Sequence, residues 1–140
     1  MRFNLLTLLV LAWAIASQLA IADDKPAPPP AKKETKAKVI GVEEFDKLRA
    51  NKTNIVLDVR TESEFKAGHI PGATNIDCMS QDFAQKLATL DQDKTYLVHC
   101  AAGVRSARAC KKLEELGFRQ LYDLRPGFKG WEAAGKPVER

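Results

Sequence analysis

The sequence has no internal repeat and no cluster of basic residues on which a nucleic acid could bind. Its 22 Lys and Arg residues and 18 Asp and Glu residues are interleaved, and the formal net charge is only +4 at pH 7. We therefore expect no nucleic-acid partner. A chain of 140 residues is also too short for several domains, because domains usually contain about 100–200 residues. These absences indicate one small domain.

Long hydrophobic runs are missing except at the N-terminus. Residues 1–22 carry one positive charge and then an apolar segment ending in Ala20-Ile21-Ala22, the small-x-small pattern that signal peptidase cleaves. We interpret them as a signal peptide, which predicts a secreted or periplasmic protein. The alternative is a retained anchor, because residues 5–22 approach the ~18 residues that a membrane span needs. Only in that case is a membrane a partner.

The segment that follows has no large apolar side chain. Residues 23–38 contain four prolines and five lysines, and such a composition cannot bury enough surface to offset the entropy of ordering. We interpret them as a flexible linker. The folded domain is then predicted to span residues 39–140.

Cysteine is scarce, with three residues in the chain. An odd number leaves at least one free thiol even in an oxidising compartment. Cys110 falls on the apolar face of a predicted helix, where a thiol is inert. Cys78 has two open possibilities, a disulfide with Cys100 or one with Cys110.

Strand and helix patterns alternate along residues 39–140. Buried strands are expected at residues 39–40, 54–59, 73–76, 95–99 and 120–124. Helices are expected at residues 43–50, 61–67, 82–90, 106–116 and 128–134. This alternation with short links predicts an α/β fold with a mainly parallel sheet of about five strands. Ligands of such sheets bind at the carboxyl ends of the strands.

Cys100 lies at one of these strand ends, in the stretch YLVHCAAGVRSA. Backbone N–H groups of the loop and the start of the next helix attract an anion and lower a thiol pKa. A thiolate nucleophile fits this position, although a buried cysteine at a strand end is the plainer alternative. The residues expected to surround the bound anion are Ala101, Ala102, Gly103, Val104, Arg105 and Ser106.

Three ordered motifs resemble one family, the rhodanese (thiosulfate sulfurtransferase) domains. CAAGVRS is similar to the family's active loop, and LDVRTESEFKAGHIPGATNI is similar to a second signature. LRPGFKGWEAAGKPVE resembles the closing segment, and together the motifs span nearly all of residues 39–139. The resemblance implies a single-domain rhodanese-like fold, in which helices cover both faces of the sheet.

The resemblance also implies a reaction. The Cys100 thiolate takes the outer sulfur of a donor such as thiosulfate, sulfite leaves, and the persulfide passes its sulfur to cyanide or a thiol. Arg105 would orient the anionic donor, and no metal or organic cofactor is required. Because an exported thiol is open to oxidation, a reducing partner protein is a further possibility.

Two other functions remain open. One is a rhodanese-like binding module that carries or senses sulfur without turnover. The other is a phosphatase or arsenate reductase, since related loops in such enzymes have the same Cys and Arg. Those loops place five residues between Cys and Arg, whereas only Ala101–Val104 intervene here. The shorter loop favours sulfur.

Residues near the other strand end are expected to support the loop. Asp58 either helps to organise it or is a structural hydrogen-bonding carboxylate. Arg60 and Glu64 are spaced for an ion pair at the entry of the helix at residues 61–67, which Thr61 is expected to cap.

Two histidines and a serine complete the candidates. The resemblance implies a loop-stabilising role for His69. His99 precedes the nucleophile and could tune its pKa, or it is a core residue. Ser106 is expected to cap the helix at residues 106–116 rather than to touch the substrate. One departure from the family pattern is Pro126, where a glycine is usual, and it bears on the fit of the substrate.

Overall fold

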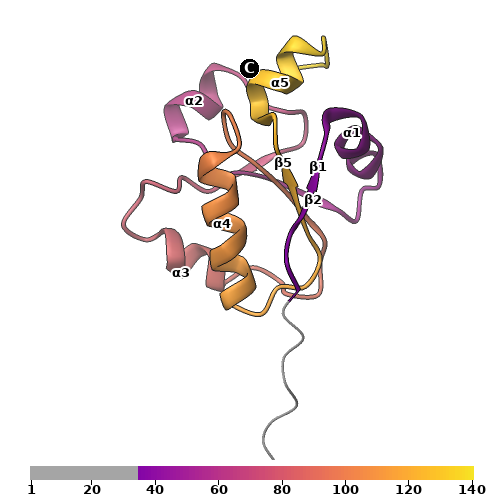
Figure 1. The fold of residues 1–140 in the computed structure, drawn as a ribbon. Coiled ribbons are helices and arrows are strands. Elements are labelled where there is room, and N and C mark those ends of the chain that lie inside the picture. The colour runs from indigo at the N-terminus through magenta and orange to yellow at the C-terminus, as the bar shows by residue number, and fades with distance from the viewer. Residues whose placement is uncertain (1–34) are drawn as a thin grey trace, which may run out of the picture. The chain divides into compact units, whose positions relative to one another are not determined.

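The structure is a computed structural model that describes residues 35–140. Within this range, five parallel strands form one sheet in the order β1-β5-β4-β2-β3 (Figure 1). The strands are β1 (Lys38–Ile40), β2 (Ile55–Asp58), β3 (Thr74–Asn75), β4 (Tyr96–His99) and β5 (Leu121–Leu124). The predicted parallel α/β sheet is confirmed, and each strand starts within one residue of its predicted position.

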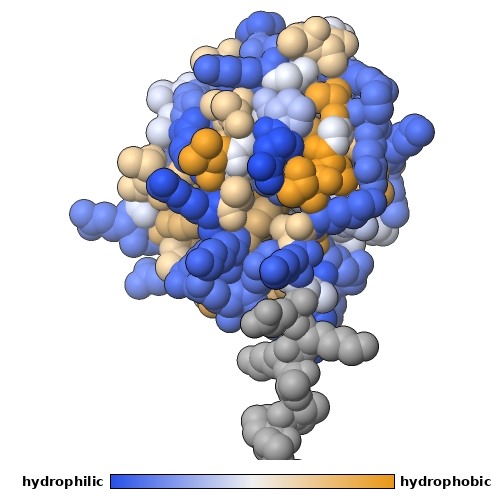
Figure 2. Space-filling view, viewed as in Figure 1, coloured by the Kyte–Doolittle hydropathy of each residue, from blue (hydrophilic) through white to orange (hydrophobic). Residues whose placement is uncertain are grey.

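Helices cover both faces of the sheet, as predicted. Helices α1 (Val42–Ala50) and α5 (Gly127–Ala133) pack on one face, and α3 (Phe83–Ala88) and α4 (Val104–Glu115) pack on the other. Helix α2 (Glu62–Ala67) follows the carboxyl end of β2 and has no buried residue. Figure 2 shows hydrophilic side chains over most of the α4 side, with the larger hydrophobic patches in the upper half of the view.

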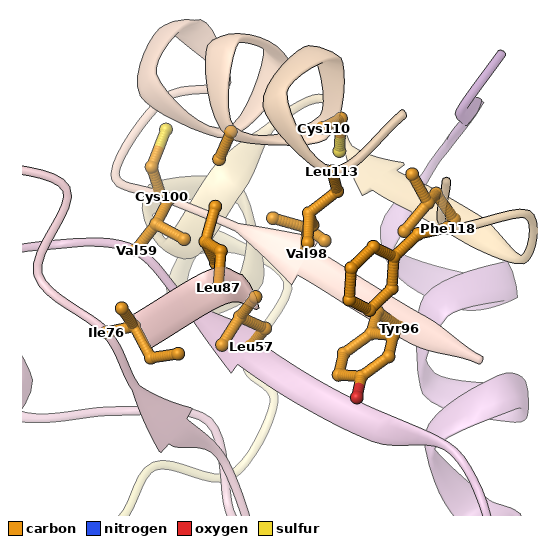
Figure 3. Close-up of a cluster of buried hydrophobic side chains, with 12 residues drawn as sticks. Leu57, Val59, Ile76, Leu87, Tyr96, Val98, Cys100, Cys110, Leu113 and Phe118 are labelled. Atoms are coloured by element: carbon orange, nitrogen blue, oxygen red, sulfur yellow. The ribbon is translucent and has the colours of Figure 1, made fainter. Parts of the chain in front are cut away.

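Each face of the sheet has its own hydrophobic core. On the α1 side, the rings of Phe45 and Trp131 meet edge to face with centroids 6.0 Å apart. On the α4 side, Val98 of β4 lies beneath Leu113 and Cys110 of the helix (Figure 3). Because the strands are all parallel, their carboxyl ends meet at one edge, and this edge carries the end of β4 and Cys100.

The capping box of α2 is confirmed. The Glu64 N–H donates to Oγ1 of Thr61 at 3.3 Å, and the Thr61 N–H donates to Oε2 of Glu64 at 3.1 Å. These reciprocal bonds satisfy two N–H groups that the first turn of a helix otherwise leaves free.

Helix α4 begins two residues earlier than predicted. Its N-cap is Gly103, whose φ of 94° lies in the left-handed region, and Val104 is the first helical residue. The predicted cap, Ser106, is therefore wrong: it lies inside the first turn. A small-residue loop ending in glycine can turn directly into the helix, so no serine cap is needed.

Two of the predicted segments fall mostly outside residues 35–140. The signal peptide at residues 1–22 lies wholly outside them, and so do residues 23–34 of the linker. The last predicted linker residue, Lys38, is the first residue of β1. In the described part of the chain, no helix is both long and apolar enough to cross a membrane.

Candidate active site

Cys100 lies immediately after β4 and is 1% exposed. Its side chain points to the same side of the sheet as Val98, toward α4 (Figure 3). The N–H of Gly103 donates to Cys100 Sγ at 3.1 Å. The chain after Cys100 thus turns its backbone back toward the sulfur, as the loop composition predicts.

The surroundings of Cys100 favour the ionised form of its thiol. Burial by itself raises the pKa of Cys100, but the Ser106 hydroxyl and the N–H groups of Ser106, Ala102 and Gly103 outweigh burial and lower it below its usual value. Hydrogen bonds to the charged form of a group favour that form. The lowered pKa makes a thiolate available for nucleophilic attack.

Ser106 is one of the hydrogen-bonding groups around the Cys100 sulfur. Its side chain is fully buried, and Cys100 Sγ lies 3.5 Å from Ser106 Oγ. The first turn of α4 therefore brings a hydroxyl to the sulfur. The sequence pattern predicts a cap at Ser106 only because the predicted helix starts two residues later than α4 does.

Arg105 is held by a carboxylate from another part of the chain. Its Nη1 and Nη2 donate to Glu64 Oε2 and Oε1 at 2.7 and 2.8 Å, a bidentate pair between α4 and α2. The hydrogen bond from Arg105 is the main cause that holds the Glu64 pKa at about 2. The pair fixes the Arg105 guanidinium beside the loop. The edge of the guanidinium that carries Nη1 and Nη2 is occupied by the Glu64 carboxylate.

The predicted ion pair between Arg60 and Glu64 is wrong. Arg60 instead donates to Asp58 through Nε at 3.0 Å and Nη2 at 2.6 Å, and also to the Gly68 carbonyl at 2.7 Å. Arg60 precedes the Thr61 cap, so the helical spacing rule does not apply to it. Both partners are almost completely buried, and the role of Asp58 in organising the loop stays a prediction.

A turn in the closing segment holds the loop from outside, a role that the sequence motif alone does not predict. The N–H groups of Phe128 and Lys129, at the start of α5, donate to the carbonyls of Cys100 and Ala101 at 2.7 and 3.0 Å. The guanidinium of Arg60 lies 4.0 Å from the Phe128 ring centroid and braces the same turn. Because these two carbonyls point toward α5 and accept hydrogen bonds there, the N–H groups of the loop can point toward the Cys100 sulfur.

Gly127 in this turn allows the close contact. A Cβ built on it would lie 2.4 Å from the Ala101 carbonyl oxygen, and its φ is 63°. Pro126, the departure noted in the sequence, is the N-cap of α5 with a φ of −70°, which a proline ring adopts without strain. The signal that could have identified this turn is the glycine next to that proline.

Comparisons with known proteins agree with this geometry. The family model described as Rhodanese-like domain matches residues 41–134, which contain the Cys100 loop and the turn that holds it. The chain belongs to the rhodanese-like family. Sulfurtransferases are among its relatives, as the next comparisons show.

Two relatives and one solved structure illustrate the similarity. The thiosulfate sulfurtransferase GlpE of Shewanella oneidensis is 31% identical over 97 residues, which are 69% of this chain and 94% of GlpE. YtwF of Bacillus subtilis is 37% identical over 92 residues, 66% of this chain and 86% of YtwF. The crystal structure of a rhodanese-related protein from Thermoplasma volcanium has a TM-score of 0.65 and 32% identity, covering 73% of this chain and 97% of that one.

The two histidines of this rhodanese-like domain lie in different settings. His99 is fully buried, and burial lowers its pKa to about 4, so it is neutral at pH 7. It is a core residue between the rings of Phe45 and Phe128. Nδ1 of His69 donates to the Phe65 carbonyl at 3.0 Å, the imidazole stacks on the Phe65 ring, and the backbone of His69 forms a bridge with Glu139, so His69 ties α2 to the C-terminal segment.

The other cysteines of the rhodanese-like domain are free thiols. Burial raises the pKa of Cys110, which confirms the inert core position predicted for it. Burial also raises the pKa of the half-buried Cys78, and neither proposed disulfide is formed in this structure. Cys78 and Arg105 line a pocket of about 260 Å³ beside the loop, whose other walls are Met79, Phe83, Ala84, Arg108, Ala109 and Lys112.

The Glu64–Arg105 pair predicts a measurable pH dependence of stability. Because the folded-state pKa of Glu64 is about 2 and its ordinary value is 4.5, the stabilisation is complete above about pH 5 and is lost as the pH falls toward 2. The side chains are 35% and 27% exposed, so water screens the pair and we expect about 1 kcal/mol. Urea unfolding of wild type and Glu64→Gln should differ by this amount at pH 7 and converge near pH 2.

A matched control is Glu62→Gln on the same helix. Glu62 pairs with Lys66, but these side chains are 69% and 72% exposed, so we expect a smaller effect at every pH. A constant difference between wild type and Glu64→Gln from pH 7 to pH 2 would show that the Glu64 carboxylate does not contribute through its charge.

Proposed function

We propose that this rhodanese-like domain is a sulfurtransferase that carries sulfane sulfur as a persulfide on Cys100. The observation that supports it most is the Gly103 N–H at 3.1 Å from Cys100 Sγ, in a loop with four residues between Cys100 and Arg105. Such a ring is narrow, and it suits a single outer sulfur better than a tetrahedral phosphate. The relationship to GlpE supports thiosulfate as a donor.

The first half-reaction loads the cysteine. The Cys100 thiolate attacks the outer sulfur of thiosulfate and forms a new S–S bond. The bond between the two sulfurs of thiosulfate breaks, and sulfite leaves with the bonding electron pair. The loop N–H groups stabilise the sulfur anion, as an oxyanion hole stabilises oxygen in acyl transfer.

The second half-reaction transfers the outer sulfur from the Cys100 persulfide to an acceptor. A cyanide carbon or a thiolate sulfur attacks the outer persulfide sulfur, and the Cys100 thiolate leaves. The products are thiocyanate from cyanide or a new persulfide from a thiol. The electron pairs balance in both steps, so neither a metal nor an external oxidant is required.

Basic side chains support the use of anionic substrates. Arg105, Arg108 and Lys112 all line the pocket beside the loop, and Arg108 and Lys112 are exposed. Positive charges at a site entrance raise the local concentration of anions such as thiosulfate. Residues 1–22 support export to the periplasm or cell exterior, where a reducing partner protein would keep Cys100 reduced.

Intact-mass spectrometry of the reduced protein with thiosulfate tests the proposal. We expect a gain of one sulfur, about 32 Da, on the peptide that contains Cys100, and we expect cyanide to remove it. Peptide mapping of Cys78→Ser, which keeps Cys100, should give the same adduct. An adduct on Cys78 alone would contradict the proposal, and so would turnover of an aryl phosphate or arsenate without any persulfide. Loading that cyanide or thiols cannot reverse would indicate the non-turnover carrier instead.

A further inference from the structure

The pocket of about 260 Å³ beside the Cys100 loop lies on the α4 side of the sheet. Its walls come from α4, from α3 and from the short segment before α3. The Cys100 side chain points to this same side of the sheet (Figure 3). Sites for drug-sized ligands have volumes of about 300–1,000 Å³, so this pocket fits a smaller molecule that lies next to the sulfur loop.

Most of the pocket wall is apolar. Four of the residues that line it are Met79, Phe83, Ala84 and Ala109, and Met79 is 72% exposed. Apolar side chains around a concave surface are typical of sites for organic ligands. Thiosulfate and cyanide have no apolar part that could contact these walls. Among the reactants of the proposed function, the organic thiol that accepts sulfur is the one whose chemistry fits the pocket.

The charges around the pocket are all positive. Within the part of the chain that the structure describes, the charged residues of the wall are Arg105, Arg108 and Lys112, and no acidic residue is among them. The Arg105 charge is compensated by the bidentate pair with Glu64, and Lys112 lies 3.3 Å from Glu115. No carboxylate of residues 35–140 lies within ion-pair distance of Arg108, which is exposed. Arg108 is therefore the cation of this wall that is available to an anionic ligand.

The basic residues follow one another along α4. Residues three, four and seven positions apart share one side of a helix, and each residue advances the axis by about 1.5 Å. Arg108 is therefore roughly 5 Å along the helix from Arg105, and Lys112 is roughly 10 Å from it. The Arg105 end is the end that carries the sulfur loop, because Ser106 Oγ lies 3.5 Å from Cys100 Sγ. A ligand with its reacting sulfur at the loop would place its anionic group roughly 5–10 Å away.

We propose that this pocket binds the sulfur acceptor, that the acceptor is an aliphatic thiol with a carboxylate at its far end, and that Arg108 selects it by binding the carboxylate. The inference rests on the proposed function and names the substrate class of its second step. The acceptor thiolate attacks the outer sulfur of the Cys100 persulfide, and an S–S bond forms between those two atoms. The bond from Cys100 Sγ to the outer sulfur breaks, and its electron pair stays on Cys100 as the thiolate. The product is an organic persulfide, and no oxidant or proton donor is consumed.

The first part of the test measures binding without sulfur transfer. Hexanoate has the apolar chain and the carboxylate but no thiol, and it is titrated into the purified, reduced protein while amide NMR shifts are recorded. We expect the shifts to change at residues 79–84 and 105–112, and Arg108→Gln to weaken binding by about 5-fold. Lys111→Gln is the matched control, because it removes the same charge from an exposed position of α4 that does not line the pocket. It should bind hexanoate within about twofold of wild type.

The second part of the test measures selectivity during transfer. Protein loaded with thiosulfate is mixed with mercaptohexanoate or with mercaptohexanol, which has the same chain and a hydroxyl in place of the carboxylate. We expect kcat/KM to be about 5- to 10-fold higher for the acid in wild type and in Lys111→Gln, and the ratio to fall to about one in Arg108→Gln. Phe83→Ala should lower kcat/KM for both thiols by a similar factor, because both lose the same apolar contact.

Three results would overturn the proposal. Hexanoate shifts that avoid the pocket residues would place the carboxylate elsewhere. Equal kcat/KM for the acid and the alcohol in wild type would show that the pocket does not select an anion. Equal weakening of hexanoate binding by Arg108→Gln and Lys111→Gln would show an effect of net charge alone. If thiosulfate does not load Cys100 while hexanoate binds the pocket through Arg108, the proposed function is rejected and the anion-binding pocket stands.

Discussion

Cys100→Ser is expected to abolish sulfur transfer, with the thiosulfate-to-cyanide rate falling by at least about 10³-fold. A serine hydroxyl at this position cannot form the S–S bond of a persulfide, and it does not ionise near neutral pH. The fold should be preserved, because the exchange replaces a 1% exposed sulfur with a slightly smaller oxygen and keeps the Ser106 neighbour. Thiocyanate formation and intact mass are the measurements.

Cys78→Ser is the matched control for that experiment. Cys78 is a second, half-buried thiol at the pocket beside the loop, so any general effect of losing a thiol from this region should show there too. We expect it to keep the rate within about threefold. A Cys100→Ser protein that still gains a sulfur, or that keeps more than a tenth of the rate, would place the carrier elsewhere.

Gly103→Ala is expected to have the second-largest effect, through the shape of the loop. A Cβ at this position would lie 2.3 Å from the carbonyl oxygen of Arg125, and the φ of 94° is one that alanine adopts only under strain. The loop must therefore move, and the Gly103 N–H then leaves the sulfur. We expect thiosulfate loading to slow by about 100-fold and the free energy of unfolding to fall by about 2–4 kcal/mol.

Gly72→Ala separates the effect of the positive φ from the effect of the contact with Arg125. Gly72 has a similar φ of 78°, but a Cβ built on it has nothing within 4 Å. It should therefore lose only the roughly 1 kcal/mol of backbone strain and keep its loading rate. Urea unfolding and stopped-flow loading of both variants give the comparison. Equal behaviour of Gly103→Ala and Gly72→Ala would mean that the contact with Arg125 does not shape the loop.

Two parts of the chain, α4 and the β5–α5 turn, support the loop that carries Cys100. The carbonyls of Cys100 and Ala101 are bonded to the first turn of α5, and Gly103 packs on the backbone of Arg125 just before it. The loop is thus clamped between α4, which supplies donors to the sulfur, and the β5–α5 turn, which fixes the peptide orientation. Small residues are required at these contacts because the backbones approach each other directly.

Local sequence patterns correctly predict most of the strands and helices. Short apolar runs predict the buried strands, and the Thr61–Glu64 spacing predicts the α2 capping box that the structure contains. The pattern failed at the start of α4, because a glycine with positive φ can begin a helix without a polar cap. It also failed for Arg60, whose side chain turns back to the strand end instead of along the helix.

The sequence by itself determined the order of strands and helices, the parallel sheet and the position of the nucleophile at the end of β4. Only the tertiary structure decided which side chains meet there. Glu64 and Arg105 are 41 positions apart in the chain, and the turn after β5 reaches the Cys100 loop only because β5 lies next to β4 in the sheet. Periodicity records which face of an element is buried, but not which distant element covers that face. The electrostatics of Cys100 therefore follow from sheet order and helix packing, because these bring its hydrogen-bond donors and charges together.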